Sequence, residues 1–595
     1  MNGLGASLQD GSVTFRVWAP RCRSVEAVIE GRPTQALWRG DDDVYSLTLP
    51  RLGAGTRYQY RLNGERYRPD PVSRWQPEGV HGPSVVVDPT AFTWTDADFR
   101  GHARADLVFY ELHIGTFTTA GTFEAVISYL EGLADLGVTA VELMPVAEFP
   151  GSRNWGYDGV HLFAPQSTYG GPRGLRRLVD ACHARGLSVV LDVVYNHLGP
   201  EGNYLAEFGP YYTDRYKTPW GPALNFDGPD GGPVRRHFIE NARSWIREFH
   251  FDGLRLDAIH SIFDASPLHI LTELAEAARA EGARLGRPVH IIAESHDNDR
   301  KIVLPPAEGG LGLDAVWADD FHHAVHVQLV GERGGYYADF GDPRQLARAL
   351  SQGFAFQGEL SEYFGRCRGT PCEDLAGEHF VICTQNHDQV GNRAQGDRLS
   401  VIVPFEAVKL AAGLMFAAPA LPLLFMGEEY GETAPFQFFT SFLDRELAAA
   451  VRQGRAAEFS RFAWQGAVPD PGDPAVFVRS RLNHSLATAP RRRGLREYYR
   501  TWLTLRRSHP ALGAGNKQLA QADLDPPGSV LSLTRGAPGG PTLHLAANLT
   551  AERKPWTPAP SWRLLLDSAD ARFGGPLSQG RTPTHLEAYQ LLLYE

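Results

Sequence analysis

One short stretch of the chain, FDGLRLDAIH at 251–260, places two charged residues inside an apolar run. Arg255 and Asp257 are two positions apart, so in a β-strand their side chains would point to the same face. Burying either charge alone is costly, and even a buried ion pair rarely adds net stability. We therefore interpret Arg255 and Asp257 as part of a functional site.

Polar residues also end three other apolar runs that have the character of strands. Asp192 and His197 lie at the end of LSVVLDVVYNH, Glu294 lies in VHIIAES, and His387 and Asp388 end FVICTQNHD. If these strands are parallel neighbours, their carboxyl ends meet at one edge. Three carboxylates from three different strands, Asp257, Glu294 and Asp388, would then share one mouth.

Such a trio suits the cleavage of a glycosidic bond. A retaining glycosidase uses an ionised carboxylate as nucleophile and a protonated carboxyl as acid, about 5–5.5 Å apart. The neighbouring arginine should keep Asp257 an anion, and nearby anions should let Glu294 keep its proton. Asp388 is then free to hold sugar hydroxyls, and His197 and His387 offer neutral donors to the same hydroxyls.

The elements that would hold these residues are eight short apolar runs between residues 107 and 429. They cover 107–113, 138–146, 187–197, 253–258, 289–295, 314–319, 380–388 and 421–429. Helical spacing of apolar residues separates runs, as at 126–134, where Gly137 is expected to end the helix. Strands alternating with helices favour a (β/α)8 TIM barrel with long βα insertions. A doubly wound sheet is the alternative, but no glycine-rich phosphate loop follows any run.

The flanking sequence alternates apolar and polar residues with the period of strands. SVTFRVWAP near the N-terminus shows this pattern, and Asn63-Gly64 between two such runs is a strong hairpin signal. SVLSLTRG, TLHLAANLT and AYQLLLYE repeat the pattern near the C-terminus. We expect an N-terminal β-sandwich at 1–90, resembling a carbohydrate-binding domain, a catalytic barrel at 91–512 and a second β-sandwich at 513–595.

The composition is that of an ordinary soluble protein. Of the 595 residues, 43% are hydrophobic, which allows a large core, and the formal net charge is −11 without a basic block that would suggest nucleic acid. The N-terminus has no apolar signal-like segment, and no apolar stretch is long enough to span a membrane. We therefore expect a cytoplasmic protein. Five scattered cysteines do not indicate a disulfide framework.

At these residues the sequence resembles the α-amylase family of glycoside hydrolases. The four short motifs that carry the resemblance are DVVYNH (192–197), GLRLDAIH (253–260), the glutamate of IIAES, and NHD (386–388). The resemblance covers the whole chain and implies Asp257 as nucleophile, Glu294 as general acid/base and Asp388 as transition-state stabiliser. It also implies that Tyr157 in NWGYDG stacks on the reacting sugar.

The same resemblance implies that Arg255, His197 and His387 line the subsite of the reacting sugar. Within the family, stretches such as ELMPVAEFPGSRNWGYDGV and TPWGPALNFDG are most similar to members that hydrolyse the α-1,4 bond next to a terminal trehalose unit. Glycogen branching enzyme, a transferase, is the nearest competitor, but its first motif usually reads DWVPAHF. A non-catalytic binding subunit is disfavoured because all three carboxylates are present.

Residues that contact the leaving group are expected beyond the three carboxylates. We predict His260 and, from WADDFHH after the sixth run, Asp320 and His322 for this role, and we add Asn392 to the substrate-binding residues. A metal site is the alternative for WADDFHH. Four aromatic residues after the third run form either a stacking wall or that loop's own core: Tyr211, Tyr212, Tyr216 and Trp220.

The resemblance implies no cofactor and no metal. The expected partners are maltooligosyl trehalose and related α-glucans, with neither nucleic acid nor membrane, and the protein is expected to be a monomer or weak dimer. Whether water or a sugar hydroxyl attacks the glycosyl-enzyme has no physical marker in the sequence. The expectation of hydrolysis therefore depends on the resemblance.

Overall fold

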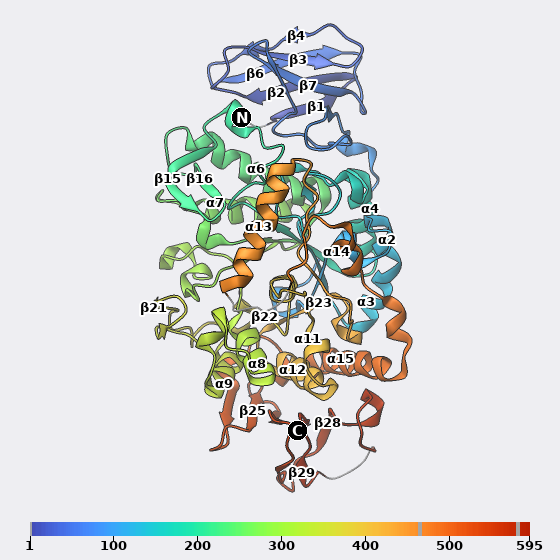
Figure 1. Ribbon diagram of the computed structural model, residues 1–595, viewed down its shortest axis with the longest axis vertical. Helices are drawn as coiled ribbons and strands as arrows, with labels where there is room; N and C mark the ends of the chain where they lie inside the picture. The colour runs from blue at the N-terminus through green and yellow to red at the C-terminus, as the bar shows by residue number, and fades with distance from the viewer. Residues whose placement is uncertain (1–2, 462–466, 579–582) are drawn as a thin grey trace.

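A closed barrel of eight parallel strands forms the centre of the molecule (Figure 1). The structure, a computed structural model, describes residues 3–461, 467–578 and 583–595. The barrel strands are β10 (Phe109–Leu112), β11 (Ala140–Leu143), β14 (Ser188–Val193), β17 (Gly253–Leu256), β18 (His290–Glu294), β19 (Ala315–Trp317), β22 (Phe380–Cys383) and β23 (Leu421–Phe425). Each predicted run contains one of them, so the predicted (β/α)8 barrel is confirmed.

The burial of these strands explains why their sequences are continuously apolar. Seven of the eight are buried along their whole length, and β18 is buried as far as its last residue, Glu294. A parallel strand with the barrel interior on one face and helices on the other has no solvent-facing side. The charged side chains on these strands therefore stand out against an apolar background.

Helices surround the barrel and connect most of its strands. In chain order the longer ones are α3 (Leu130–Leu136), α4 (Gly171–His183), α6 (Gly231–Phe249), α7 (Ile270–Leu285), α8 (Asp320–Val330), α9 (Pro343–Gln352), α12 (Phe405–Ala417), α13 (Arg445–Arg461) and α15 (Pro490–Ser508). Shorter ones are α1 (Ile114–Phe117), α2 (Phe123–Val126), α5 (Leu205–Phe208), α10 (His387–Gly391), α11 (Leu399–Ile402) and α14 (Pro474–Arg479). Gly137 ends α3 at a φ of 105°, as predicted.

One connection departs from the expected alternation of strand and helix. Between β18 and β19, residues 295–314 contain two single 3-10 turns, Arg300–Ile302 and Pro306–Glu308, and no α-helix. Glycines and prolines are frequent in this segment (LPPAEGGLGL), which disfavours a continued helix. The prediction of a helix between every pair of strands was therefore wrong at this connection.

Long βα insertions rise above the carboxyl ends of the strands. They contain two two-stranded ribbons, β12 (Ala147–Glu148) with β13 (His161–Pro165) and β15 (Tyr212–Thr218) with β16 (Gly221–Leu224). A third ribbon, β20 (Leu360–Ser361) with β21 (Arg366–Cys367), lies between α9 and β22. The insertions form the walls around the strand ends that carry the predicted site.

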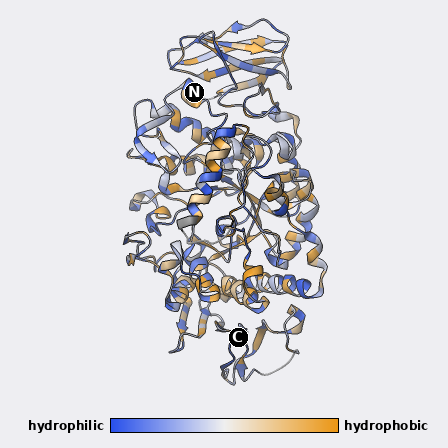
Figure 2. Ribbon diagram, viewed as in Figure 1, coloured by the Kyte–Doolittle hydropathy of each residue, from blue (hydrophilic) through white to orange (hydrophobic). Residues whose placement is uncertain are grey.

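Two sheets packed face to face make up the N-terminal part. One contains β1 (Gly5–Gln9), β2 (Ser12–Trp18), β6 (Val44–Pro50) and β5 (Trp38–Arg39), and the other β4 (Gln35–Ala36), β3 (Val25–Ile29), β7 (Arg57–Leu62), β8 (Arg66–Arg68) and β9 (Ser84–Val85). Hydrophobic and hydrophilic residues alternate along these strands (Figure 2). Asn63 and Gly64 connect β7 and β8 with positive φ angles, as the hairpin signal predicted.

The C-terminal part is also a sheet domain and lies at the opposite end of the barrel (Figure 1). Its five-stranded sheet contains β24 (Ala520–Leu524), β25 (Val530–Gly536), β26 (Thr542–Asn548), β30 (Leu591–Tyr594) and β28 (Leu564–Asp567), and β27 (Lys554–Pro555) pairs with β29 (His585–Leu586). Sheet domains therefore flank the barrel on both sides. Among the described helices, none is both long and apolar enough to cross a membrane.

Asp96, in the segment between the N-terminal sheets and β10, fixes that segment to the barrel. Its Oδ2 accepts hydrogen bonds from His183 (2.9 Å) and His250 (2.7 Å) and from Arg287 (3.1 Å). These partners lie at the ends of α4 and α6 and just before β18. The contacts hold the N-terminal sheets in a defined position against α4.

Candidate active site

The structure brings the three predicted catalytic carboxylates together at the carboxyl ends of the barrel strands. Asp257 directly follows β17, Glu294 is the last residue of β18, and Asp388 lies in α10 just after β22. All three are partly exposed in a protein whose barrel strands are otherwise buried. This combination of strand-end position and partial exposure marks the mouth of the barrel as the candidate active site.

Arg255 sits beneath this mouth and is fully buried. Its Nη1 donates to both carboxylate oxygens of Asp192 (3.0 and 2.8 Å) and to Oδ1 of Asp257 (2.7 Å). Its guanidinium also lies over the ring of Trp317, 4.2 Å from the centroid. One cation is thus shared between two carboxylates, which explains why an arginine and an aspartate occupy the same face of a buried strand.

Asp257 is held by both of its carboxylate oxygens. Arg255 binds Oδ1, and Nδ2 of Asn196 donates to Oδ2 at 2.7 Å and to the main-chain oxygen of Asp257 at 2.8 Å. Ala258, the next residue, has a φ of 42°, a strained conformation for a residue other than glycine. The backbone therefore turns sharply at the carboxylate, which fixes its direction into the mouth.

Glu294 is linked to the same turn and holds its proton at neutral pH. The backbone N–H of Ala258 donates to Oε2 of Glu294 at 2.6 Å. Burial, and then the anions of Asp257 and Asp388, raise the pKa of Glu294 to about 8, against the opposing charge of Arg255. The pKa of Glu294 is raised in the predicted direction, but burial rather than the nearby anions is the largest cause. A carboxyl with a raised pKa beside a carboxylate suits acid catalysis.

His387 is charged, contrary to the prediction of a neutral donor. Its Nδ1 contacts Oε1 of Glu111 at 2.5 Å, and its Nε2 lies 2.7 Å from the hydroxyl of Tyr157. Burial lowers the pKa of His387, but the carboxylates of Glu111 and Asp388 outweigh burial and raise it to about 9. The Tyr157 hydroxyl in turn donates to Asp192 at 2.7 Å, which continues the network to Arg255.

His197 differs from His387 in charge and in surroundings. Burial lowers its pKa, so its imidazole is neutral, and its ring stacks on Trp220 with centroids 4.4 Å apart. The aromatic residues of this loop were predicted to form either a stacking wall or the loop's own core, and the structure shows both. Tyr211 is buried against Trp18 and belongs to the core, whereas Trp220 is half exposed beside the mouth.

His260 and Asn392 lie at the rim of the mouth. His260 is half-buried, and its ring centroid is 4.0 Å from that of His296. Nδ2 of Asn392 lies 3.3 Å from Oδ1 of Asp388, and its Oδ1 accepts from Arg455 at 2.9 Å. Both residues therefore lie near the carboxylates, and their contact with a sugar stays a prediction.

Asp320 and His322 lie behind the mouth, which is not where leaving-group contacts would be. Asp320 is fully buried; it pairs with Arg368 at 2.8 Å and accepts backbone N–H groups from residues 355 and 356. His322 is also buried and bonds to the main-chain oxygen of Thr384 and the hydroxyl of Tyr337. Their polar atoms are taken up by the protein, so we withdraw the prediction that they contact the sugar.

Asp319, rather than its neighbour Asp320, faces the carboxylates. It is partly exposed, and burial and then the anion of Asp388 raise its pKa to about 6. Asp319 also acts on Glu294, whose pKa it helps to raise. The helix α8 begins at Asp320, so the change from strand to helix separates two adjacent aspartates into one mouth residue and one buried residue.

Two residues of this network were not predicted from the sequence. Glu111 interrupts the apolar strand β10 as Arg255 interrupts β17, and the same argument about a buried charge could have identified it. Asn196 lies in the motif DVVYNH but carries no charge to mark it. Its role depends on the path of the loop after β14, which the sequence alone does not define.

Comparisons with known proteins agree with this geometry. Residues 87–220 match the family described as alpha amylase, catalytic domain. A malto-oligosyltrehalose trehalohydrolase from Saccharolobus solfataricus is 47% identical over 480 residues, which cover 81% of this chain and 83% of that protein. The crystal structure of a Salmonella typhimurium protein superposes with a TM-score of 0.91 at 40% identity, and covers 100% of this chain and 99% of that one.

A transferase relative is more distant. The 1,4-alpha-glucan branching enzyme of Corynebacterium jeikeium is 30% identical and matches 72% of this chain, but only 62% of its own length. Coverage and identity are both higher for the trehalohydrolase, and the barrel with its flanking sheets agrees with the alpha-amylase match. The chain therefore belongs to the malto-oligosyltrehalose trehalohydrolases of the α-amylase family.

Proposed function

We propose that this protein is a retaining glycoside hydrolase that cleaves the α-1,4-glucosidic bond next to the terminal trehalose of maltooligosyl trehalose. The products are trehalose and a maltooligosaccharide. The observation that carries this proposal is that Asp257, bound to the guanidinium of Arg255, and Glu294, whose pKa is raised, lie at one sharp turn. Membership of the trehalohydrolase family supports hydrolysis over transfer.

In the first step, Asp257 attacks the anomeric carbon of the sugar that precedes the trehalose unit. Arg255 and Asn196 hold the carboxylate so that one lone pair is directed at that carbon. Glu294 gives its proton to the glycosidic oxygen as the bond breaks, so trehalose leaves as a neutral alcohol. A covalent β-glycosyl ester on Asp257 remains.

In the second step, water cleaves that ester. Glu294, now ionised, takes a proton from the attacking water, and the carboxylate of Asp257 is released. Asp388 holds hydroxyl groups of the distorted ring in both steps, and the imidazolium of His387 positions the hydroxyl of Tyr157 beside it. Two inversions at the anomeric carbon give overall retention, so the first-formed reducing end should be the α anomer by proton NMR.

An arc of aromatic rings runs from His260 toward a cavity of about 350 Å³ next to the mouth. Successive centroids are 4.0 Å apart for His260 and His296, 4.8 Å for His296 and Phe364, and 4.9 Å for Phe364 and Tyr363. Tyr363, Tyr336 and Asn392 line the cavity. We assign the trehalose unit to this arc, because stacked rings can carry two sugars joined by a 1,1 linkage.

Product analysis tests the proposed function. The protein is incubated separately with a maltooligosyl trehalose and with the maltooligosaccharide of equal length, and products are separated by chromatography. Free trehalose from the first substrate, and a clearly lower kcat/KM on the second, are expected. Equal kcat/KM values would contradict trehalose selectivity and favour a general α-1,4-glucan hydrolase, whereas longer or branched glucans as products would favour a transferase.

Two aromatic variants test where the trehalose unit lies. Phe364→Ala should lower kcat/KM on maltooligosyl trehalose roughly 2- to 13-fold, and less on the plain oligosaccharide, because an aromatic contact is worth roughly 0.5–1.5 kcal/mol. Trp220→Ala, which removes a ring stacked on His197 and outside the arc, should affect both substrates alike. The reverse pattern would assign the trehalose to the Trp220 side.

We further propose that the enzyme acts in the cytoplasm on soluble α-glucans as a monomer or weak dimer. The absence of a membrane-spanning helix among the described residues is consistent with this assignment. Cell fractionation and analytical ultracentrifugation would test the two points separately.

A further inference from the structure

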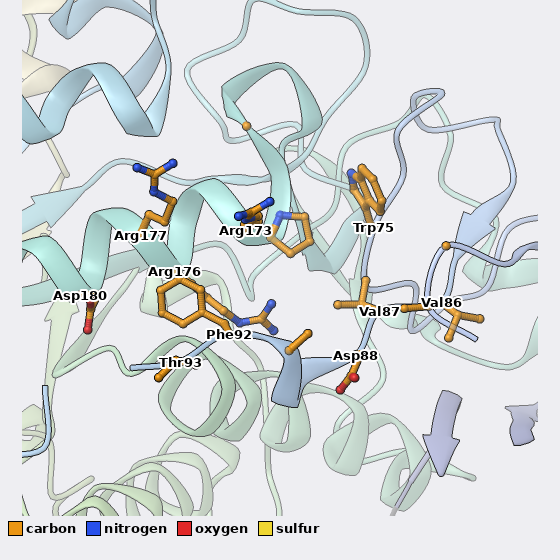
Figure 3. Close-up of a pocket in the computed structure, with 15 residues that line it drawn as sticks. Trp75, Val86, Val87, Asp88, Phe92, Thr93, Arg173, Arg176, Arg177 and Asp180 are labelled. Atoms are coloured by element: carbon orange, nitrogen blue, oxygen red, sulfur yellow. The ribbon is translucent and has the colours of Figure 1, made fainter. Parts of the chain in front are cut away.

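A second cavity, of about 590 Å³, lies between the N-terminal sheets and the barrel. One wall is the outer face of α4, and the opposite wall is the segment that leads from β9 toward β10 (Figure 3). None of the described residues that line it belongs to the candidate active site. Its volume lies in the range of sites for small molecules, roughly 300–1,000 Å³.

Three arginines of α4 give this cavity a basic wall. Arg173, Arg176 and Arg177 follow one another along the helix in Figure 3. Arg177 pairs with Glu124 at 2.8 Å. Arg173 is exposed, and its side chain forms no hydrogen bond or ion pair with any residue in the described part of the chain.

Arg176 is the most informative of the three. It is only 4% exposed, its Nε donates to the main-chain oxygen of Glu248 at 3.1 Å, and its guanidinium lies over the ring of Phe249. Its Nη1 and Nη2 form no hydrogen bond within the described residues, although Arg176 lines the cavity. A buried guanidinium with two unused nitrogens is costly unless an anion pairs with it.

The two acidic residues of the cavity are already bound by protein groups. Both oxygens of Asp180 accept from Thr95, at 2.7 Å from its backbone N–H and 2.9 Å from its hydroxyl. Oδ1 of Asp88 accepts from the backbone and hydroxyl of Thr90. The charges of Asp88 and Glu248 act on Arg176, but neither carboxylate forms a hydrogen bond with its guanidinium among the described residues. The nitrogens of Arg173 and Arg176 are therefore available to a ligand.

Apolar and aromatic side chains complete the cavity. Trp75 lies at one end of the arginine row, and Val87 and Phe92 face it from the opposite wall (Figure 3). Guanidinium groups match phosphate oxygens in geometry and charge, and flat apolar walls suit a sugar or base ring. A neutral glucan would bring no anionic oxygen to the two unused nitrogens of Arg176.

We propose that this cavity binds a phosphate monoester carried on a ring, as in a sugar phosphate or a nucleotide. The phosphate would pair with Arg173 and the unused nitrogens of Arg176, and the ring would lie against Trp75 and Phe92. A ligand there would contact both the N-terminal segment and α4, the helix that leads into β14.

Isothermal titration of the full-length protein tests the proposal. The probes are inorganic phosphate, glucose 6-phosphate, adenosine monophosphate and the neutral trisaccharide maltotriose. A ring-bearing phosphate should bind more tightly than inorganic phosphate. The tighter of the two ring compounds identifies the source as a sugar phosphate or a nucleotide, and either result supports the proposal.

Variants locate the site. Arg173→Ala changes an exposed residue and should weaken phosphate-monoester binding roughly tenfold or more, and Arg176→Lys should do the same, because each loses charge-assisted hydrogen bonds. Arg500→Ala, another exposed arginine far along the chain on α15, is the matched control and should bind normally. Maltooligosyl trehalose hydrolysis without phosphate should be unchanged in Arg173→Ala.

No binding by any phosphate probe at millimolar concentration, or binding unaffected by Arg173→Ala and Arg176→Lys, would overturn the proposal. Maltotriose binding that these variants abolish would also overturn it.

Discussion

At the scale of single residues, hydrogen bonds from Arg255 fix the orientation of the carboxylates of Asp192 and Asp257. One nitrogen of its guanidinium contacts both Asp192 and Asp257, and Asn196 holds the remaining oxygen of Asp257. The carboxylate therefore cannot rotate freely before it attacks. A nucleophile oriented in advance needs less reorganisation in the transition state.

Replacing the nucleophile tests that arrangement. Asp257→Asn keeps the shape and the hydrogen bond to Asn196 but removes the charge that attacks the sugar. We expect kcat to fall on the order of 10⁴-fold or more, with an unchanged circular dichroism spectrum. Near wild-type turnover in this variant would exclude Asp257 as the nucleophile.

The proton on Glu294 sets the behaviour of the enzyme in alkaline solution. Because burial raises the pKa of Glu294 to about 8, the acid is protonated below that pH and loses its proton as the pH rises through it. We expect kcat/KM to decline above about pH 8. Glu294→Gln should remove this limb and lower kcat roughly 10²- to 10⁴-fold on the natural substrate.

Activated aryl glycosides provide the control for Glu294. Their leaving groups need little protonation, so Glu294→Gln should impair the formation of the glycosyl-enzyme from them much less. Equal losses on the two kinds of substrate would assign the acid to another residue.

Glu111 should act on catalysis through the charge of His387. In Glu111→Gln the carboxylate that raises the histidine pKa is lost, so burial should bring that pKa from about 9 to a lower value. A larger share of the imidazole would then be neutral at pH 8, and kcat should fall roughly tenfold or more as the charged hydrogen bond that positions Tyr157 is weakened. Titration of the His387 ring by NMR measures the shift directly.

Glu142→Gln is the matched control for that variant. Glu142 lies on the neighbouring strand β11, is equally buried, and has two carboxyl oxygens without a hydrogen-bond partner in the described structure. Burial raises its pKa well above the usual range, so the residue is already neutral and glutamine leaves the charge unchanged. Unaltered activity in this variant and reduced activity in Glu111→Gln would separate the charge of His387 from general packing.

The residues of the site could be predicted from the sequence only where a charged residue interrupts or ends an apolar run. Asp257, Glu294 and Asp388 end apolar strands, and the barrel brings strand ends together. The charge of His387 could not be predicted, because it depends on Glu111, 276 positions away along the chain. The same limit applies to Asn196, which shows its role only in contact with Asp257.

At the scale of elements, the boundary between β19 and α8 decides what two adjacent aspartates do. Asp319 is directed to the mouth, and Asp320, as the first residue of α8, binds backbone N–H groups at 355 and 356 together with Arg368. Asp320 thus fixes the chain that follows α9 to the top of β19. The sequence WADDFHH contains both aspartates, but only the backbone path distinguishes them.

Removal of Asp320 should therefore cost stability rather than selectivity. Asp320→Ala leaves Arg368 buried without its anion, and we expect the free energy of unfolding to fall by roughly 3–5 kcal/mol. The ratio of kcat/KM between maltooligosyl trehalose and the plain oligosaccharide should stay close to that of the wild type. Urea denaturation and kinetics on both substrates measure the two quantities.

Asp319→Asn is the neighbouring control. It should change stability little and move the alkaline decline of kcat/KM to lower pH, because one anion that raises the pKa of Glu294 is removed. A large loss of selectivity in Asp320→Ala, with normal stability, would restore Asp320 as a substrate contact.

Strand positions were well predicted because they follow from simple burial. All eight barrel strands are long enough and apolar enough to be recognised, and the hairpin at Asn63-Gly64 depends on local turn chemistry alone. The missing helix between β18 and β19 was not predicted, since the regular alternation of the other connections was extended to it. Loops such as the one that carries Trp220 combine core and surface aromatics, which composition does not separate.

At the scale of the whole molecule, the three-part organisation also follows from the sequence, whereas the cavity of Arg173 and Arg176 does not. Its walls come from two segments about 80 residues apart, and neither contains a recognisable motif. Only the docking of the N-terminal sheets against α4, held at Asp96, creates that space.

The closure of the barrel has a consequence for how the protein gains activity during folding. Phe109 on β10 pairs with Leu423 on β23, more than 300 residues later, and the contact between Glu111 and His387 depends on that closure. Contacts this distant in sequence form slowly, because a long loop must be ordered before they give any stabilisation. After dilution from denaturant, far-UV circular dichroism should recover first, and hydrolysis of maltooligosyl trehalose should return only with the slowest phase. Simultaneous recovery of both signals would mean that the ends of the barrel meet early, before most helices form.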